Sequence, residues 1–296
     1  MKLSTSHGLH YHMPDTRRTC SPTESLAAIK QAGYDSVDLN LWGLCSPGGP
    51  MAVDHWLETV EQYRNASETV SLPVYQTHAN TMSGTEWDDP DFPLRDHVHR
   101  TILRCIEGAA RVGAAYVVVH PFNLAHAPLY SVSENKKACI SYLAPYIEAA
   151  KKHGIKLAVE NMIDFGRRHR RYCAGDIYEL IDLVDTINDP DVGLCLDTGH
   201  ANISGMNVSA AIRAAGSRLV CTHINDNHAK LGQDEHLLPF FGDINWAETM
   251  KALGEIGYSG HLTYELKPQA VPEAARPLWL RYTADIGREL IKMTKQ

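Results

Sequence analysis

Short apolar runs rich in β-branched residues alternate along the chain with longer segments of helical periodicity. Each run is bounded by glycine, proline or polar residues, which is typical of buried strands. The eight predicted strands cover residues 2–6, 36–41, 73–78, 115–120, 155–161, 192–197, 219–225 and 261–266. The periodic segments predict a helix between Ser21 and Gly33 and further helices over residues 54–70, 96–112, 133–153, 175–186, 207–215, 245–256 and 273–294.

The order of these elements predicts the fold. Segments such as ARVGAAYVVVH and AKKHGIKLAVEN repeat a helix, a glycine stop and a buried strand. Eight strand–helix units in 296 residues favour one (β/α)8 TIM barrel with a parallel eight-stranded core, as a single domain over residues 1–296. A doubly wound open sheet is the competing fold, but the first loop has no GxGxxG motif for a dinucleotide.

The first helix carries clear start and stop signals. Ser21 is placed as a cap, Pro22 as the first helical residue and Glu24 as the reciprocal capping partner. Gly33 is placed to end the helix. Near the other end of the chain, Asp243 or Asn245 is expected to cap the helix that starts there.

Histidines and carboxylates gather at the carboxyl ends of the predicted strands and in the loops that follow. The nine residues are His78, His120, Glu160, Asp197, His200, His223, Asp234, His236 and Glu265. In a barrel these ends converge on the face that carries the active site, so the nine side chains are expected around one mouth. Imidazole nitrogens together with carboxylate oxygens suit Zn²⁺, Mn²⁺, Fe²⁺ or Co²⁺ better than Mg²⁺, which prefers oxygen ligands and retained water.

The nine residues do not all carry the same weight. A histidine at a strand end is, taken alone, more often packed or hydrogen-bonded than a metal ligand. Glu160 and Glu265 differ, because each follows an apolar strand (KLAVE and HLTYE). A carboxylate at such a place is costly unless it is paired or bound to a metal.

Composition and charge narrow the function classes. The chain has 28 Lys and Arg against 35 Asp and Glu, a net charge of −7, which argues against a general affinity for nucleic acid. No apolar run reaches the roughly 18 residues of a membrane span, and the N-terminal stretch lacks the apolar region of a signal peptide. The seven cysteines form no CxxC pair, which favours a reducing, cytoplasmic location over disulfides or a thiolate zinc site.

Several motifs together resemble one known superfamily. VVVHP, LAVEN, LCLDTGH, THINDN, DEHLLPFFGDINW and YELK are similar to the xylose isomerase-like barrels, which include sugar isomerases, ketose 3-epimerases, inosose isomerase and dehydratase, and endonuclease IV. The resemblance to ketose 3-epimerases implies one divalent ion held by Glu160, Asp197, His223 and Glu265. The resemblance to endonuclease IV implies three zinc ions, with further ligands at His78, His120, His200, Asp234 and His236. One ion or up to three therefore remain open, with Mn, Co or Zn favoured over Mg.

The resemblance implies a metal-dependent isomerase or epimerase of carbohydrate metabolism. The metal would coordinate the carbonyl and a neighbouring hydroxyl of a small sugar, sugar phosphate or cyclitol and stabilise an enediolate. Glu160 and Glu265 would be the acid and base that move the proton. A lyase or dehydratase, including one that cleaves a C-glycosidic bond, would use the same groups, so the sequence does not separate it from an isomerase.

Two other function classes have less support. An endonuclease IV-like trinuclear zinc phosphodiesterase would have to grip DNA, and the one basic run is Arg167–Arg171 in the loop after the fifth strand. A barrel without catalytic activity is opposed by the presence of all nine polar residues.

Substrate-binding candidates surround the same predicted mouth, although each of them has a packing or surface role as its alternative. They are His7, His10, Trp42, Asn161, Arg167, His200 and Lys267. The long, turn-rich loop over residues 80–94 is expected to cover the pocket, together with Phe240 and Phe241. Surfaces outside the mouth could pair subunits, so a homo-oligomer stays open.

Overall fold

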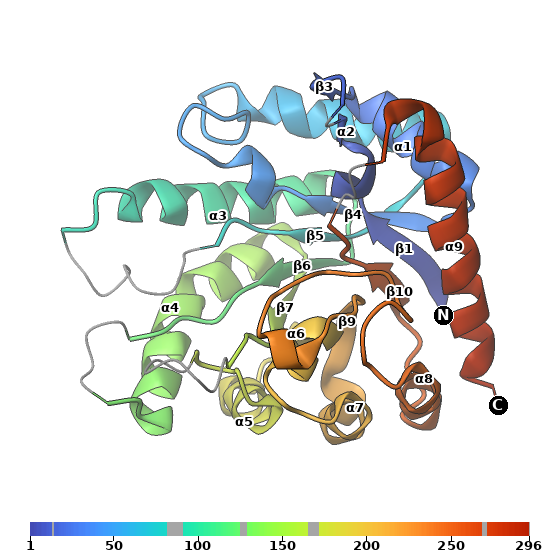
Figure 1. Ribbon diagram of the computed structural model, residues 1–296. Coiled ribbons are helices and arrows are strands. Elements are labelled where there is room, and N and C mark those ends of the chain that lie inside the picture. The colour runs from blue at the N-terminus through green and yellow to red at the C-terminus, as the bar shows by residue number, and fades with distance from the viewer. Residues whose placement is uncertain (14, 82–90, 125–128, 165–171, 268–270, 296) are drawn as a thin grey trace.

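The eight predicted strands form one parallel sheet in the computed structural model, which describes residues 1–13, 15–81, 91–124, 129–164, 172–267 and 271–295. The strands are β1 (Lys2–Ser6), β4 (Ser36–Asn40), β5 (Val74–His78), β6 (Tyr116–Val119), β7 (Lys156–Glu160), β8 (Val192–Asp197), β9 (Leu219–His223) and β10 (His261–Tyr264). They lie in the order β10-β1-β4-β5-β6-β7-β8-β9. The ring closes where Ile224 pairs with Tyr264 and the N–H of Ile224 donates to the Thr263 carbonyl at 2.7 Å. The predicted TIM barrel is therefore confirmed (Figure 1).

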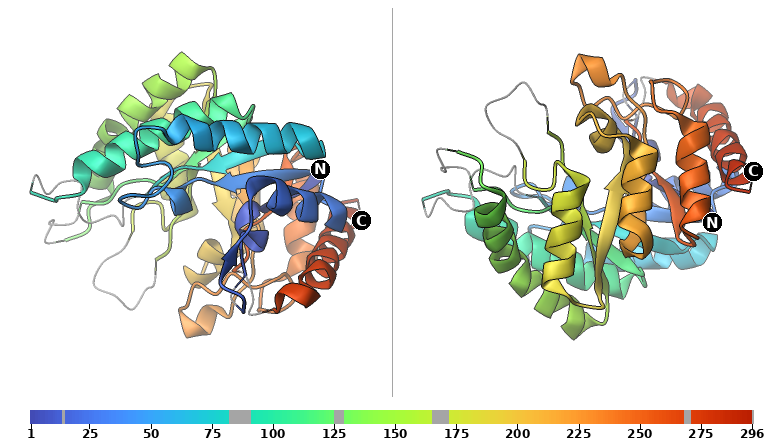
Figure 2. Two further views of the ribbon diagram at one scale, coloured as in Figure 1. Left: turned by 90° about the horizontal axis from the view of Figure 1, so that it is seen from above. Right: turned by 90° about the horizontal axis from the view of Figure 1, so that it is seen from below.

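Helices surround the sheet because each has one apolar face. They are α1 (Pro22–Ala32), α2 (Trp56–Val70), α3 (Arg95–Arg111), α4 (Val132–His153), α5 (Ile177–Ile187), α6 (Thr198–Ile203), α7 (Val208–Ala215), α8 (Trp246–Glu255) and α9 (Arg276–Met293). In α3, for example, Ile102, Cys105, Ile106 and Ala109 follow the helical repeat and are buried. Figure 2 shows the helices outside the strands in both views, with the two chain ends close together.

The capping predictions are confirmed. Ser21 and Glu24 form the reciprocal capping box of α1, and Gly33 ends that helix with a φ of +104°, which favours glycine. Asn245, rather than Asp243, caps α8 by accepting a hydrogen bond from the Glu248 N–H.

The structure contains a helix and a pair of short strands that the sequence pattern did not predict. Helix α6 follows β8 without a loop, because the Asp197 side chain accepts from the His200 N–H and so caps the helix from the last residue of the strand. A small antiparallel pair, β2 (His12–Met13) and β3 (Arg18–Thr19), follows the short 3-10 helix η1 (His7–His10). Several strands also end one or two residues earlier than predicted, since their last residues belong to the mouth of the barrel.

The barrel interior is built in two layers. Val118, Ala158, Cys195 and Cys221 form an apolar cluster with no exposed surface, which we call the floor. Strand side chains alternate between the two faces of a sheet, so the residue two positions further on points into the same interior. In β6 to β9 and just beyond, these next residues are His120, Glu160, Asp197 and His223. With His78 and Glu265 they form what we call the polar layer.

The sequence also argues against disulfide bonds and against a membrane-spanning segment. All seven cysteines are buried free thiols. Among the residues that the structure describes, none of the helices combines the length and hydropathy needed to cross a membrane.

Candidate metal centre

Glu160 is the central residue of the polar layer. Its Oε2 lies 3.2 Å from Nε2 of His78 and 3.1 Å from Nε2 of His120, and its Oε1 lies 2.7 Å from Nδ1 of His223. Burial raises the pKa of the carboxyl group, but the three histidines outweigh burial and hold the pKa well below its ordinary range. Glu160 is therefore an ionised carboxylate enclosed by imidazoles.

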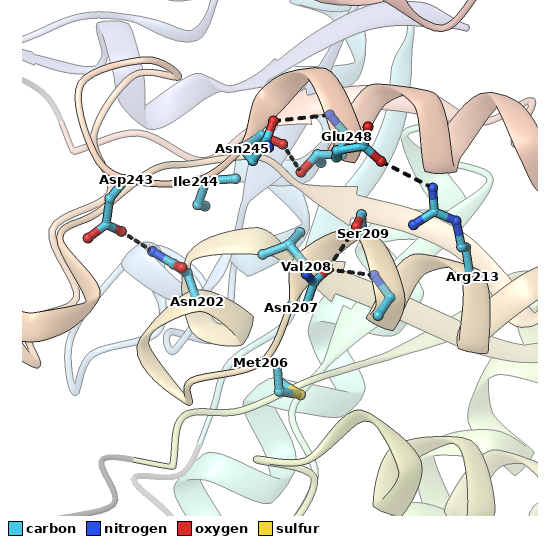
Figure 3. A pocket seen from close by; sticks show the side chains of 12 residues that line it. Asn202, Met206, Asn207, Val208, Ser209, Arg213, Asp243, Ile244, Asn245 and Glu248 are labelled. Carbon is cyan, nitrogen blue, oxygen red and sulfur yellow. Dashed lines mark hydrogen bonds and ion pairs between the residues drawn. The ribbon is translucent and has the colours of Figure 1, made fainter.

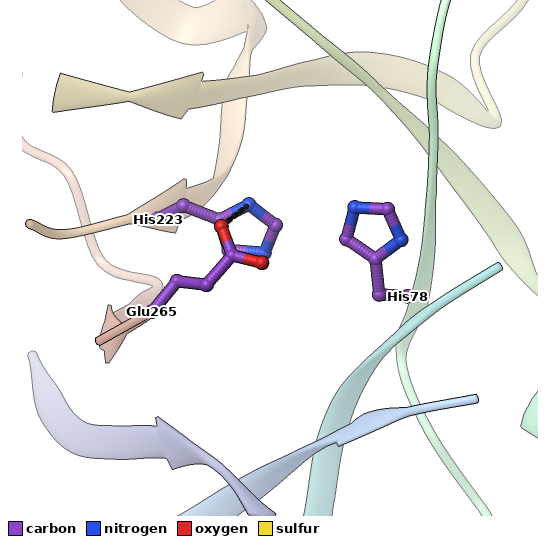
Figure 4. Close-up of side chains that lie close together, drawn as sticks. All are labelled: His78, His223 and Glu265. Carbon is purple, nitrogen blue, oxygen red and sulfur yellow. Dashed lines mark ion pairs between the residues drawn. The ribbon is translucent and has the colours of Figure 1, made fainter. Parts of the chain in front are cut away.

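His223 contacts three carboxylates. Glu160 and Glu265 belong to the polar layer, and Asp38 lies below it. Nδ1 of His223 also faces Oε2 of Glu265 at 3.3 Å, and its Nε2 lies 3.3 Å from Oδ2 of Asp38 in β4. Figure 4 shows the Glu265 carboxylate beside the His223 ring, with His78 facing both. Although burial lowers the pKa of His223, the surrounding anionic groups raise it well above its usual value.

Asp197 is held by backbone and amide groups on both sides. Its Oδ1 accepts from the His200 N–H at 2.7 Å, and its Oδ2 accepts from Nδ2 of Asn225 at 2.7 Å. The close approach of α6 to Asn225 requires Gly199, because an added Cβ there would collide with the Asn225 amide. Burial, reinforced by Glu160 and Glu265 against the nearby histidines, raises the pKa of Asp197 to about 6.

Ligand atoms of Glu160, Asp197, His223 and Glu265 lie within 4.8 Å of one another. Three carboxylates at such separation repel one another in a buried site that has the apolar floor beneath it along β6 to β9. A divalent cation offsets this repulsion, and the donor set of one imidazole and three carboxylates suits Zn²⁺, Mn²⁺ or Co²⁺. The four residues therefore fit a metal ion.

Three further histidines are oriented in the way that metal-ligating histidines usually are. Nδ1 of His78 donates to the Ala79 carbonyl, Nδ1 of His200 to the Asn161 carbonyl and Nδ1 of His236 to the Glu265 carbonyl, at 2.9, 2.8 and 2.7 Å. A backbone carbonyl on one ring nitrogen fixes the tautomer and leaves the other nitrogen for a proton or a cation. The Nε2 of each ring faces a carboxylate, at 3.2 Å for His78, 3.9 Å for His200 and 2.7 Å for His236.

These histidines belong to three more groups of potential ligands, each with ligand atoms within 4.8 Å of one another. The groups are His78 with His223 and Glu265, His78 with His120 and Glu160, and His200 with Asp234 and His236. His236 adopts a φ of +49°, a strained backbone for a residue with a side chain, so its position is set by the surrounding loop. All nine predicted residues therefore lie in linked groups at one end of the barrel.

Comparison with known proteins agrees with this geometry. The family model of the xylose isomerase-like TIM barrel matches residues 26–283. The chain belongs to this family. It is 39% identical over 98 residues to the D-psicose 3-epimerase of Enterocloster bolteae, which covers 33% of this chain and 30% of that protein. It is 26% identical over 193 residues to the inosose isomerase of Bacillus subtilis, covering 64% of each chain.

One solved structure in this comparison contains a metal. The crystal structure of the IolI protein with a bound zinc atom superposes with a TM-score of 0.71 at 18% identity, over 100% of this chain and 98% of that one. At this identity the likeness establishes the shared fold. The sequence matches to the two curated relatives cover less than two thirds of each relative's length.

The substrate-binding candidates of this xylose isomerase-like barrel separate into two sets. His200 and Asn161 lie in the centre, where the Asn161 side chain bonds both backbone groups of Asp197. His7 does not face the mouth, because its Nδ1 accepts from the Asn40 N–H at 3.0 Å and its Nε2 bonds the Tyr63 hydroxyl at 3.1 Å. The prediction for His7 is corrected to a packing role.

The remaining candidates have different outcomes. Lys267 is exposed and its Nζ donates to the Asp234 carbonyl, so it supports the loop that carries Asp234 and His236. His10 is buried beside the start of α9. Arg167, the rest of the basic run and most of the predicted covering loop lie outside the described residues. Phe240 and Phe241 are about half exposed.

Trp42 lines a cleft at the mouth. The cleft, of about 370 Å³, lies between the segments that follow β4 and β5 and is also lined by Asn80, Phe92 and Leu94. Asn80 is two residues beyond His78. A second cleft, of about 470 Å³, lies between α7 and α8 and outside the polar layer (Figure 3).

Sequence reasoning missed the residues that support the centre. Asp38 accepts from Nε2 of Gln76 at 3.1 Å and contacts His223, and Asn225 holds Asp197. Asp226 fixes the long loop before α8 by accepting from the indole of Trp246 and three backbone N–H groups. Asp38 could have been found by the reasoning used for Glu160, because it is a carboxylate inside an apolar strand.

Proposed function

We propose that this protein is a divalent-metal-dependent isomerase or epimerase that acts on a small sugar, sugar phosphate or cyclitol bearing a carbonyl group. The observation that carries the proposal is the convergence of Glu160, Asp197, His223 and Glu265 above an apolar floor. The matches to D-psicose 3-epimerase and inosose isomerase support the same reaction class.

Glu160 and Glu265 are proposed to move the proton. A divalent ion at this centre would supply Lewis acidity toward the substrate's carbonyl oxygen and neighbouring hydroxyl. Burial raises the pKa of Glu265, but His223 and His236 outweigh it, so the net shift is downward, as for Glu160. Both carboxylates are therefore ionised at neutral pH and ready to accept a proton from the carbon beside the carbonyl. They extend from β7 and β10, and thus approach the centre from different strands.

His200 and Asn161 are proposed to position the substrate and the centre. Nε2 of His200 has its nearest carboxylate oxygen 3.9 Å away, which leaves it available for a substrate hydroxyl. Asn161 binds the backbone of Asp197 with both ends of its amide and so fixes the relative positions of β7 and β8.

Elemental analysis of the purified protein, followed by chelation and metal replacement, tests the proposal. We expect bound Mn, Co or Zn, loss of activity on ketoses or keto-cyclitols after chelation, and recovery when the metal is returned. Product analysis separates isomerisation from dehydration or C-glycoside cleavage. A chelated protein that retains full activity on its ketose would contradict the metal's role.

A trinuclear zinc phosphodiesterase is the second candidate. The groups around His120 and His236 favour it, because they supply ligands beyond those of a single ion. Three zinc ions per chain together with cleavage of abasic-site DNA would support this candidate, whereas one ion with turnover of a ketose supports the isomerase.

A further inference from the structure

The start of α9 contains a buried cation that has no partner. Arg276, the first residue of α9, has no exposed surface, and its Nε, Nη1 and Nη2 make no hydrogen bond within the described chain. A buried guanidinium stays charged and normally has its donors satisfied by carboxylate or phosphate oxygens. An uncompensated buried charge is among the costliest arrangements in a protein.

Two more buried polar atoms, Nε1 of Trp279 and Nδ1 of His10, also lack partners. Trp279 lies three residues further along α9, so it is on the same side of the helix, and its Nε1 is buried without an acceptor. His10, at the end of η1, lies within electrostatic reach of Arg276, and its buried Nδ1 has no partner. An indole N–H and a guanidinium can only donate, so the missing group must be rich in acceptors.

The start of the helix also lacks an acidic group. The residue before α9, Ala275, provides no side-chain cap, and the first turn contains no acidic residue. The Arg276 N–H already donates to the Glu273 carbonyl and Pro277 has no N–H, so the helix contributes through its dipole, which favours an anion at this end.

The acidic residues nearby are already engaged. Glu273 binds Thr16 and Arg18 of the β2–β3 segment, and Asp15 accepts from the Glu273 N–H. Asp15 acts on Arg276 only through its electrostatic field. These contacts fasten the β2–β3 segment beside the start of α9.

We propose that Arg276, Trp279, His10 and the first turn of α9 form a binding site for an oxyanion of the phosphate class. The site lies at the carboxyl end of the barrel, since η1 follows β1 and α9 follows the loop after β10. It is separate from the metal centre and none of its three side chains is a candidate ligand there. The anion comes either from a phosphate group on the substrate or from free phosphate.

Calorimetric titration of the full chain with inorganic phosphate tests the site. Arg276→Met keeps the length of the side chain and removes its charge, and we expect it to weaken phosphate binding by about tenfold or more. In phosphate-free buffer the same variant should melt at a temperature equal to or above that of the wild type, because the unpaired charge is gone. Arg281→Met, an exposed position on α9 that pairs with Asp285, is the matched control and should retain wild-type binding.

Several results would overturn the site. The first is a wild-type protein that binds no phosphate. The second is an Arg276→Met variant that binds phosphate as tightly as the wild type. The third is an Arg276→Met variant whose melting temperature is lowered while its phosphate affinity is unchanged. Phosphate that binds only at the metal centre would produce the second of these. If Arg276→Met does not fold, Trp279→Phe removes one donor and keeps an aromatic side chain, and it should weaken binding by about threefold or more.

A second measurement distinguishes the source of the anion and is the only part that rests on the proposed function. A phosphate carried by the substrate predicts that Arg276→Met lowers kcat/KM for a ketose 6-phosphate by about tenfold while the parent ketose is unaffected. If free phosphate is the ligand, the ratio of kcat/KM for the ketose 6-phosphate to kcat/KM for the parent ketose should be the same in the wild type and in Arg276→Met. The variant should still lose phosphate binding. Phosphate affinity is measured without turnover, so a failure of the isomerase assignment leaves this test intact.

Discussion

Along β6 to β9, the floor and the polar layer of the barrel lie two residues apart and differ in chemistry. The floor contains Val118, Ala158, Cys195 and Cys221, and the polar layer has His120, Glu160, Asp197 and His223 two positions further along the same segments. All of these strands are parallel, so one step of two residues moves each side chain from one layer to the next. Along these strands the floor therefore places apolar atoms and thiols below the site, while the polar layer opens to the mouth.

This difference shows how a carboxylate can remain ionised inside the barrel. Apolar surroundings alone would raise the pKa of Glu160, as burial does for Asp197. The pKa of Glu160 nevertheless stays well below its usual value because three imidazoles surround the carboxylate. The floor strengthens these electrostatic interactions by keeping the local dielectric constant low. The floor thus strengthens the interactions that keep Glu160 ionised in the polar layer. A substitution in the floor and a substitution in the polar layer should therefore change different properties of the protein.

The largest effect is expected in the polar layer. Glu160→Gln keeps the size of the side chain but removes the charge that holds His78, His120 and His223, and it removes the proposed base. We expect kcat to fall by roughly 10²–10⁴ while the protein remains folded. Steady-state kinetics and circular dichroism measure the two quantities.

A matched control is available on the surface. Glu107→Gln, on α3, breaks only an exposed ion pair with Arg111 and should leave kcat unchanged. If Glu160→Gln retained wild-type turnover, the polar layer would not perform the chemistry and the contrast with the floor would concern stability alone.

The next largest effect is expected at Asp38, which lies below His223 and bonds its far ring nitrogen. Asp38→Asn should lower metal affinity by about 10–100-fold, because the carboxylate orients the imidazole and increases its basicity. Competition with a fluorescent chelator measures the affinity. Asp35→Asn, which weakens an ion pair with Arg288 just before the same strand, should leave it unchanged. Equal affinity in the two variants would show that Asp38 acts only in packing.

The sequence was sufficient to predict most of the polar layer. A strand-end rule for barrels, applied to Glu160, Asp197, His223 and Glu265, placed them at one mouth, because parallel strands share a direction. The same rule could not place Asp38, whose carboxylate is in the middle of β4 and reaches His223 from below. It also failed for His7, since the 3-10 turn after β1 directs that ring toward Tyr63 rather than toward the mouth.

Buried histidines with and without carboxylate partners should also respond differently to pH. His223 has carboxylate partners and a raised pKa, whereas burial without such a partner lowers the pKa of His7 to about 4. In the unfolded chain His7 has its ordinary value near 6.5. As pH falls below 6.5 the unfolded state takes up the proton first, so stability present above pH 6.5 is lost on the way to pH 4.

The size of this loss can be measured by comparing unfolding at pH 7 and pH 5. At pH 5 His7 should account for about 2 kcal/mol of the lost free energy of unfolding. His7→Asn retains an acceptor for the Asn40 N–H and should reduce the difference between the two pH values by that amount. His12→Asn, at an exposed position, should not reduce it. An unchanged difference in His7→Asn would place the acid sensitivity elsewhere.

The smallest effect is expected when the floor is altered without a change of shape. Val118→Thr introduces a hydroxyl group among Ala158, Cys195 and Cys221, where the cluster offers only apolar atoms and thiols. Because the hydroxyl loses its water partners, the free energy of unfolding should fall by roughly 1–2 kcal/mol, as chemical denaturation would show. Turnover per bound metal should stay within about twofold, since Val118 touches no reacting group and the shape of the lumen is kept. Val132→Thr, on the exposed surface of α4, controls for the substitution itself. A large loss of turnover at unchanged stability would mean that the floor belongs to the reacting site, and the division between the two layers would then be wrong.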